Sequence, residues 1–462
     1  MDSQRVSSSQ LARNITGWDL GEGALHRLLA DALRERITSG DLPTGAMLPS
    51  QRELARVLAV SRTTVGNAYD ELTSEGWLSS HRGAGTRIRT SRLRAGPLAQ
   101  GDRLRTYAAP AEPVDLSSGV LPASPLMGQV LRGNWDQELR GLLRVGFLPW
   151  GVDSFREEVA SYYDELGLPT TPNQVLATNG SHHALTLLVD CLLEPGDVVL
   201  VEDPTYRGAL DVFGRRGVQV VGVPVDAGGI DSGALRLAIR KHQPRLVYVL
   251  PAAHNVTGVT WSAMRRQQVA DVVTDSGVLL VDDGSTADLA PAEHPGHLGA
   301  LLPEAQSLTI GSLTKLFWAG LRVGWIRGPA DVLQAALEGR VTADIAGSIP
   351  SQVLAAACLP LAAAARELRA VELAHDRQDA SLLLQEYLPD WTHDPTAAGA
   401  CLWVDTHQDT LVLASRAHRE RVQLIPGSDF SPSDGWRSHV RLPLGRPDVL
   451  ERGIKALSRL LG

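Results

Sequence analysis

The chain has 462 residues, of which 44% are hydrophobic and 21% charged, and this predicts two or three compact domains rather than a disordered chain. The net charge is -8, but the first 94 residues hold 13 arginines, no lysine and 10 acidic residues. A basic head with a charge of +3 therefore precedes an acidic body with a charge of -11. This asymmetry is expected of a nucleic-acid-binding module on a partner domain. Three scattered cysteines and no long unbroken apolar run argue against a disulfide framework, a metal site, a signal peptide and a membrane span, and favour a cytoplasmic protein.

The head begins with helical patterns. Apolar residues recur at helical spacing over residues 24–38, 51–58 and 62–72. Ser50 and Ser61 stand where the second and third helices need an N-cap. Two short helices joined by a tight turn predict a helix-turn-helix, and the two strand-like runs that follow within residues 76–88 predict a wing.

The third predicted helix carries the candidate DNA contacts. An arginine and three hydroxyl residues stand at its first turn, where a recognition helix meets phosphates and base edges: Ser61, Arg62, Thr63 and Thr64. Arg52, at the start of the second helix, is placed to reach the DNA backbone. Arginine and threonine at a helix start can also be only solvated or capping residues, but the wing and the charge asymmetry favour DNA binding.

Three short motifs give the head a family resemblance. PSQRELA at 49–55, VSRTTV at 60–65 and GAG at 83–85 resemble the winged helix of GntR-type bacterial regulators. The resemblance implies double-stranded operator DNA as partner and Arg52, Arg62, Thr64 and Gly83 as contacts. We therefore expect a winged helix over residues 20–90.

Residues 91–112 lack periodicity and are predicted to be a linker. In the body, residues 113–462, strand-like runs alternate with helical stretches such as 182–193 and 263–274. The strand-like runs are at 198–201, 218–223, 246–250, 278–281 and 307–310, with later ones at 400–404 and 439–442. This alternation predicts an α/β fold with a mostly parallel sheet, ligands at the carboxyl ends of its strands, and a smaller α+β subdomain after about residue 349.

A phosphate site is predicted at the strand-to-helix turn TNGSHH, residues 178–183. The backbone N–H groups there, and the Ser181 hydroxyl, can hold a phosphate at a helix N-terminus formed by Gly180, Ser181 and His182. Ser312 and Arg322, which lie on either side of a lysine, can complete this site.

That lysine, Lys315, is the residue best placed to form an imine with an aldehyde cofactor such as pyridoxal 5'-phosphate. Tyr206 is placed to stack on the cofactor ring, and Asn255 to donate to its phenolic oxygen. Asp282, after an apolar strand, can keep the ring nitrogen protonated. Arg441 is a bidentate partner for an effector carboxylate, although alone it could be a salt-bridged arginine.

Taken in order, these residues resemble a fold type I aminotransferase over residues 114–461. With the head, the whole chain resembles the MocR branch of GntR regulators, whose aminotransferase-like domain senses pyridoxal phosphate or its amino-acid adducts. Two tyrosine hydroxyls usual in such enzymes are missing, because Gly284 and Ser285 follow the aspartates and Phe147 occupies the position that reaches the neighbouring subunit. His182 and Val256 also depart from the enzyme pattern.

These features predict a homodimeric transcription regulator that holds pyridoxal phosphate on Lys315 and responds to the cofactor or to a small amine or amino-acid effector, with weak or no turnover. Two alternatives remain. One is an active aminotransferase with a DNA-binding head, and the other is a regulator whose body is a cofactor-free dimerisation scaffold.

Overall fold

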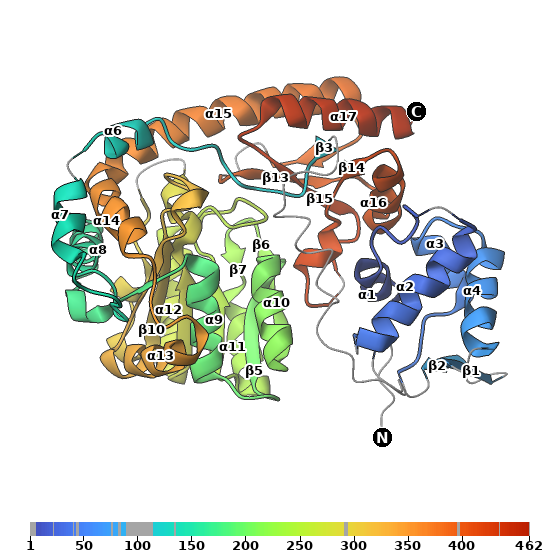
Figure 1. The fold of residues 1–462 in the computed structure, drawn as a ribbon, viewed down its shortest axis with the longest axis horizontal. Helices are drawn as coiled ribbons and strands as arrows, with labels where there is room; N and C mark the ends of the chain where they lie inside the picture. Colours follow the sequence, from blue (N-terminus) through green and yellow to red (C-terminus); the bar gives the residue numbers. More distant parts are fainter. Residues whose placement is uncertain are drawn as a thin grey trace.

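A computed structural model describes residues 6–88 and 114–461, apart from residues 22, 40, 43–45, 75–76, 82–84, 134, 291–293, 395–397 and 434. Figure 1 shows a helical head, drawn in blue, beside a larger α/β body. The linker expected at 91–112 and the wing residue Gly83 lie outside the described residues.

The head is a winged helix with one additional N-terminal helix. Its elements are α1 (Ser8–Asn14), α2 (Leu25–Ser39), α3 (Gln51–Val57), α4 (Arg62–Ser74), and the antiparallel wing strands β1 (Leu78–His81) and β2 (Gly85–Ile88). Ser50 and Glu53 form a reciprocal capping box that starts α3. Ala59, with φ of +52°, turns the chain, and the Ser61 hydroxyl then accepts from the Thr64 N–H at 3.0 Å. The predicted helix-turn-helix and wing are confirmed.

An eight-stranded sheet forms the centre of the body, in the order β4-β11-β10-β9-β8-β5-β6-β7. From β10 to β6 neighbouring strands are parallel, whereas β11 is antiparallel to both its neighbours and β7 is antiparallel to β6. The strands are β4 (Val175–Thr178), β5 (Val198–Asp203), β6 (Gln219–Asp226), β7 (Gly229–Ile230), β8 (Leu246–Val249), β9 (Leu279–Asp283), β10 (Ser307–Ser312) and β11 (Gly324–Arg327). The predicted mostly parallel α/β fold is confirmed.

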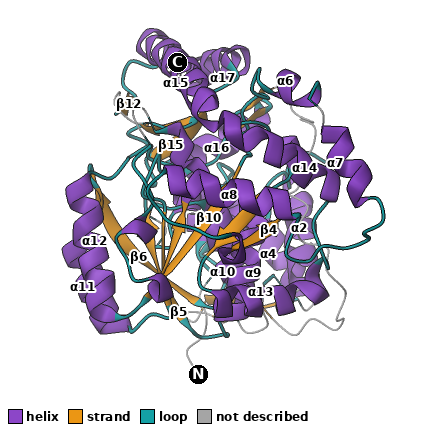
Figure 2. Cartoon of the chain, turned by 90° about the vertical axis from the view of Figure 1, so that its left-hand side faces the viewer, coloured by secondary structure: helices purple, strands orange, loops and turns teal. Residues whose placement is uncertain are grey.

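Helices cover both faces of this sheet (Figure 2). On one face the core joins alternate strand residues to α9 (Ser181–Leu192), α10 (Arg207–Arg216) and α13 (Ala330–Ala343). On the other face the intervening strand residues pack on α11 (Ser232–His242) and α12 (Ala263–Ser276). Because successive side chains of a strand point to opposite faces, the helix layer that a strand residue meets identifies its side of the sheet.

A smaller subdomain packs beside the large sheet. Its three antiparallel strands are β12 (Thr392–His393), β13 (Cys401–Asp405) and β15 (His439–Pro443), and a short parallel pair joins β3 (Val114–Asp115) to β14 (Val422–Gln423). Its helices are α15 (Ala362–Tyr387), α16 (Thr410–Arg419) and α17 (Pro447–Leu461), and α15 and α17 run side by side at the top of Figure 1. The predicted α+β subdomain is thus present.

The remaining helices, α6 (Met127–Leu131), α7 (Trp135–Leu142), α8 (Asp153–Glu165) and α14 (Ile349–Cys358), flank the large domain. The helical stretch Ile349–Tyr387 is long and apolar enough to cross a membrane by length and composition alone. Its buried residues Val353 and Ala365 pack in one core with α8, and Leu373 and Leu384 pack in the subdomain core. A core helix passes the same test, and this packing accounts for its apolar composition.

Candidate functional site

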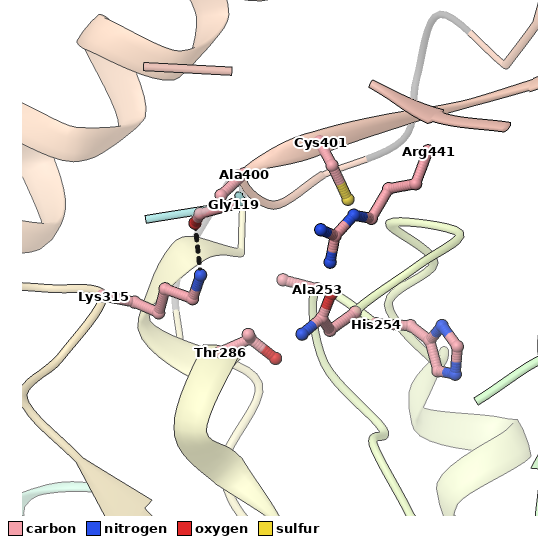
Figure 3. Close-up of a pocket in the computed structure, with 9 residues that line it drawn as sticks. Gly119, Ala253, His254, Thr286, Lys315, Ala400, Cys401 and Arg441 are labelled. Carbon is pink, nitrogen blue, oxygen red and sulfur yellow. Dashed lines mark hydrogen bonds between the residues drawn. The ribbon is translucent and has the colours of Figure 1, made fainter. Parts of the chain in front are cut away.

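A small pocket lies between the large domain and the subdomain (Figure 3). Lys315 and Arg441 point into it from opposite sides. Asn255, Thr286 and Cys401 also line it. The other lining residues are Gly119, Ala253, His254 and Ala400. The cavity volume is about 10 Å³, which is room for about one water molecule.

The pocket is small because backbone carbonyl groups of the chain itself lie against its two basic side chains, Lys315 and Arg441. Lys315 Nζ donates to the Gly119 carbonyl at 2.5 Å, and Arg441 Nη2 donates to the Ser117 carbonyl. We call residues 115–119 the strap. The Asp115 carboxylate fixes the strap by accepting from the Ser117 N–H at 2.8 Å and from the Ser117 hydroxyl at 2.6 Å.

The environment of Lys315 favours its neutral amine. Burial, and then the nearby positive charge of Arg441, lower the pKa of Lys315 from 10.5 to about 8. A larger fraction of the side chain is therefore an unprotonated nucleophile near neutral pH than for an exposed lysine.

The residues predicted to hold a phosphate lie where β4, β11 and β10 are neighbours. Gly324, at the start of β11, pairs with Ser312 of β10 on one side and with Thr178 of β4 on the other. Gly180, with φ of +96°, then begins α9, whose first-turn N–H groups have no partners within the helix. Arg322 lies against this turn, because a Cβ at Gly180 would meet its guanidinium at 3.3 Å and its Nη2 donates to the Asn179 carbonyl at 2.9 Å.

Ser181 and His182 form the first turn of α9, and the His182 ring meets the Tyr206 ring edge-on at 6.5 Å. Tyr206 precedes α10 and packs on the core of the α9 face. The sequence-predicted residues Gly180, Ser181, His182, Ser312 and Arg322 thus gather at one edge of the sheet, with Tyr206 beside them.

Asp282 does not join this group. Its carboxylate accepts from the Leu298 N–H at 2.9 Å and lies 3.4 Å from His297, while the preceding same-side residue Leu280 packs on the α12 face. Strand alternation turns Asp282 away from α9, so its placement at the cofactor ring needs correction.

The carboxylate on the α9 face is Asp283. It accepts from the Tyr248 hydroxyl at 2.5 Å, and both Tyr248 and Val281 pack in the core that Tyr206 borders. Burial raises the pKa of Asp283, and hydrogen bonds from Ser285 and Tyr248 oppose this shift. The sequence does not distinguish Asp283 from Asp282, because two adjacent aspartates end the strand and only the register separates them.

The tyrosine that usually follows the aspartates is absent here for a steric reason. A Cβ at Gly284 would come within 2.6 Å of the buried His297 ring, so the backbone there has no space for a larger residue. The hydroxyl that reaches the pocket is that of Thr286, which donates to the Ala252 carbonyl at 3.1 Å. The second departure, Phe147, is 67% exposed, and it lies beside the exposed Leu143 and Val145.

His254 fixes the loop that carries Asn255 through hydrogen bonds to its backbone. The Nδ1 of His254 accepts from the N–H groups of Val256 and Thr257 at 3.1 and 3.2 Å. Burial lowers the pKa of His254 to about 3 and raises that of the adjacent Glu202 to about 8, so both are neutral at pH 7. Among the described residues no group of His, Cys, Asp and Glu could hold a metal ion.

In the head, Arg52, Ser61, Arg62 and Thr63 are exposed and Thr64 is half-buried at the start of α4. The capping hydrogen bond of Ser61 leaves the arginine and the Thr63 hydroxyl directed to solvent. This geometry supports the candidate DNA face for the residues that the structure describes.

Comparison with known proteins decides the family. The model described as "Bacterial regulatory proteins, gntR family" matches residues 25–88, and that described as "Aminotransferase class I and II" matches residues 114–457. YisV of Bacillus subtilis, an uncharacterized HTH-type transcriptional regulator, is 30% identical, and the match covers 94% of this chain and 95% of that protein. The chain is a MocR-type regulator of the GntR family.

Other relatives agree with this assignment. The HTH-type pyridoxine biosynthesis transcriptional regulator PdxR of Corynebacterium glutamicum is 28% identical over 84% of this MocR-type chain and 85% of its own length. The structure of the α-aminoadipate aminotransferase LysN of Thermus thermophilus superimposes with a TM-score of 0.68, at 24% identity, over 78% of this chain and 96% of that one. The latter likeness shows the fold alone, and this fold typically binds pyridoxal phosphate.

Proposed function

We propose that this transcription regulator binds pyridoxal 5'-phosphate covalently through Lys315 and senses the cofactor or an amine effector that reacts with it. The single observation that carries the proposal is a lysine amine with a pKa near 8 that faces a buried arginine across one pocket. Bound pyridoxal phosphate would supply an aldehyde that condenses with amines.

The residues of the chain fit this cofactor. Gly180, Ser181 and His182 at the start of α9, with Ser312 and Arg322, would hold its phosphate, and the φ of +96° at Gly180 favours a glycine there. Tyr206 would cover the ring, and Asn255 would donate to its phenolic oxygen. Asp283, in place of Asp282, would hold a proton on the ring nitrogen.

Arg441 supports an effector that carries a carboxylate. The carboxylate of such a ligand would replace the Ser117 carbonyl as acceptor of the Arg441 guanidinium. When Lys315 is bound to the cofactor, the Gly119 carbonyl would also lose its hydrogen-bond donor. The strap follows the predicted linker at 91–112 directly in the chain. Ligand binding would therefore release the segment that leads to the head and change how the head is presented.

The DNA side of the proposal rests on the exposed start of α4. Arg62 and Thr63 would reach base edges in the major groove, with Arg52, Ser61 and Thr64 at the phosphates and Gly83 in the wing. A homodimer would present two such heads to a repeated or palindromic operator in the cytoplasm.

The alternatives are less well supported. An efficient aminotransferase would need the missing hydroxyls, and Gly284 has no space for a tyrosine. A cofactor-free scaffold would have no need of a low-pKa lysine, a glycine that starts α9 with Arg322 beside it, and a buried carboxylate at the end of β9.

The near-ultraviolet and visible spectrum of the purified protein, titrated with pyridoxal phosphate, tests the proposal. The natural chain should develop a saturable cofactor band, and Lys315→Ala should lack it while keeping the same melting temperature within a few degrees. Equal spectra for both proteins would contradict covalent binding. A transamination assay on a panel of amino acids then separates a sensor from an enzyme.

A further inference from the structure

The short helix η7 (Gly427–Phe430) contacts both walls of the ligand site and the head. We propose that η7 is a relay that transmits the state of the ligand site to the head, with Asp429 as its positioning residue. The inference rests on the proposed function for the identity of the ligand, but its contacts are independent of any ligand.

The first contact joins η7 to the head. The Asp429 carboxylate, which is only 6% exposed, lies 3.4 Å from the Arg13 guanidinium of α1. Leu11 and Ile15, on either side of Arg13, are buried in the same core as α2 and α4. Because α1 is fixed to the helix-turn-helix by this core, a force on Arg13 acts on the whole head.

The second contact joins η7 to the wall that holds Tyr206. The other oxygen of Asp429 lies 3.5 Å from Arg207, the first residue of α10. The Thr205 N–H also donates to the Phe430 carbonyl at 2.8 Å. Tyr206 is thus flanked on both sides by residues bound to η7, so a ring stacked on Tyr206 would alter the position of η7.

The third contact joins η7 to the effector arginine. The Arg441 guanidinium lies 5.2 Å from the centre of the Phe430 ring, a cation–π arrangement. Arg441 at present donates to the Ser117 carbonyl. A carboxylate that replaces the Ser117 carbonyl on Arg441 would change the contact between Arg441 and Phe430, which is next to Asp429.

A second head–body contact provides a matched control. Arg56 of α3 lies 2.7 Å from Asp409 before α16, and Leu411 of α16 packs in the head core. Neither Arg56 nor Asp409 lines the pocket. Both contacts leave Arg62 and Thr63 exposed. The body therefore fixes the position of the head without covering its candidate DNA-binding residues.

The ligand-free test compares amide hydrogen exchange of α1 in the natural chain, Arg207→Gln and Asp409→Asn. Two arginines orient one carboxylate, so losing Arg207 should loosen the Arg13 contact and speed α1 exchange by roughly three- to tenfold, although Arg207 is not in the head. Asp409→Asn keeps the cap of α16, since the Leu411 N–H can donate to the amide oxygen, and should leave α1 unchanged. An α1 rate in Arg207→Gln equal to that of the natural chain would overturn the relay.

The ligand test adds pyridoxal phosphate, with its absorption band as proof of binding. Binding should change α1 exchange at least about threefold in the natural chain and in Asp409→Asn, and should leave α1 unaffected in Asp429→Asn, which keeps the band. An α1 response in Asp429→Asn as large as in the natural chain would refute the relay. Absence of the band in the natural chain would refute the proposed function instead, and the ligand-free comparison would still decide the relay.

Discussion

Lys315 and Arg441 place two basic side chains in one pocket, and none of its nine lining residues is acidic. The Cys401 thiol cannot balance them, because burial raises its pKa and keeps it neutral. Lys315 donates to the Gly119 carbonyl and Arg441 to the Ser117 carbonyl, and both carbonyls belong to the strap. The site therefore favours ligands that bring negative charge, as a phosphate or carboxylate does.

Formation of the cofactor band should depend on pH through Lys315. The neutral amine is the reactive form, and its pKa is lowered to about 8, so the band should grow as pH rises from about 6.5 to 9 with a midpoint near 8. Arg441→Gln removes a positive neighbour that disfavours protonation of Lys315, so the midpoint of the cofactor band in this variant should move to higher pH. Spectra recorded across this range check both statements, and a natural-chain midpoint near the ordinary 10.5 would contradict them.

The assignment of Asp283 can be tested against Asp282. Asp283→Asn removes the carboxylate from the α9 face and should weaken pyridoxal phosphate binding by about 10- to 100-fold, the loss expected for a hydrogen bond to a charged group. Asp282→Asn can still accept from Leu298 and should bind the cofactor normally. Absorption titrations give both affinities, and the reverse order would restore the assignment to Asp282.

The two aspartates show what residue-level prediction could and could not achieve. Lys315 and Arg441 were singled out from the sequence, and the structure brings them to one pocket, whereas Arg322 is exposed beside the start of α9. Asp282 and Asp283 differ only in which face of β9 they occupy, and that depends on pairing with β8 and β10. Backbone partners such as the Gly119 carbonyl carry no signal in the sequence.

At the scale of elements, β3 and the buried Leu116 anchor the start of the strap, and the Asp115 carboxylate holds Ser117 where its carbonyl meets Arg441. Asp115→Ala removes both hydrogen bonds that fix Ser117 and should raise the affinity for pyridoxal phosphate about tenfold, because the closed form loses about 1.4 kcal/mol. Ser118→Ala is the control, since that hydroxyl accepts only a long 3.4 Å contact from Val120. An affinity in Asp115→Ala equal to that of the control would show that the strap does not compete.

Most elements could be predicted because their periodicity is strong. The runs at 198–201 and 307–310 became β5 and β10, and each strand extends two residues further, to Asp203 and to Ser312. The antiparallel strand β11 was missed because its four residues begin with a glycine that is needed for close packing on Gly180 and Gly311. Helix α1 was missed because seven residues rich in serine and arginine give a weak apolar pattern.

At the scale of the whole molecule, exposed apolar residues mark a candidate subunit interface. Leu143 and Phe147 are 74% and 67% exposed and lie in the segment expected to approach a partner's site. The double variant Leu143→Asp/Phe147→Asp should weaken a homodimer at least about a hundredfold, because a two-fold interface would bury each new charge near its copy. Sedimentation velocity measures the effect.

Leu237→Asp supplies the matched control for the dimer. Leu237 on α11 is also 67% exposed but lies on the other side of the large domain, so this variant should sediment like the natural chain. If the natural chain is itself monomeric, or if the double variant remains dimeric, the interface lies elsewhere.

Under the proposed function, the strap would also determine how much ligand is needed before the protein responds. Its two carbonyls would act as a tethered competitor, and the measured affinity of a ligand would equal its intrinsic affinity multiplied by the fraction of molecules in which the strap is open. Substitutions at Asp115 or Ser117 can therefore shift the response threshold over a wide concentration range while Lys315 and Arg441 remain unchanged. Regulators with identical ligand-binding side chains could in this way be set to different cellular levels of the same metabolite.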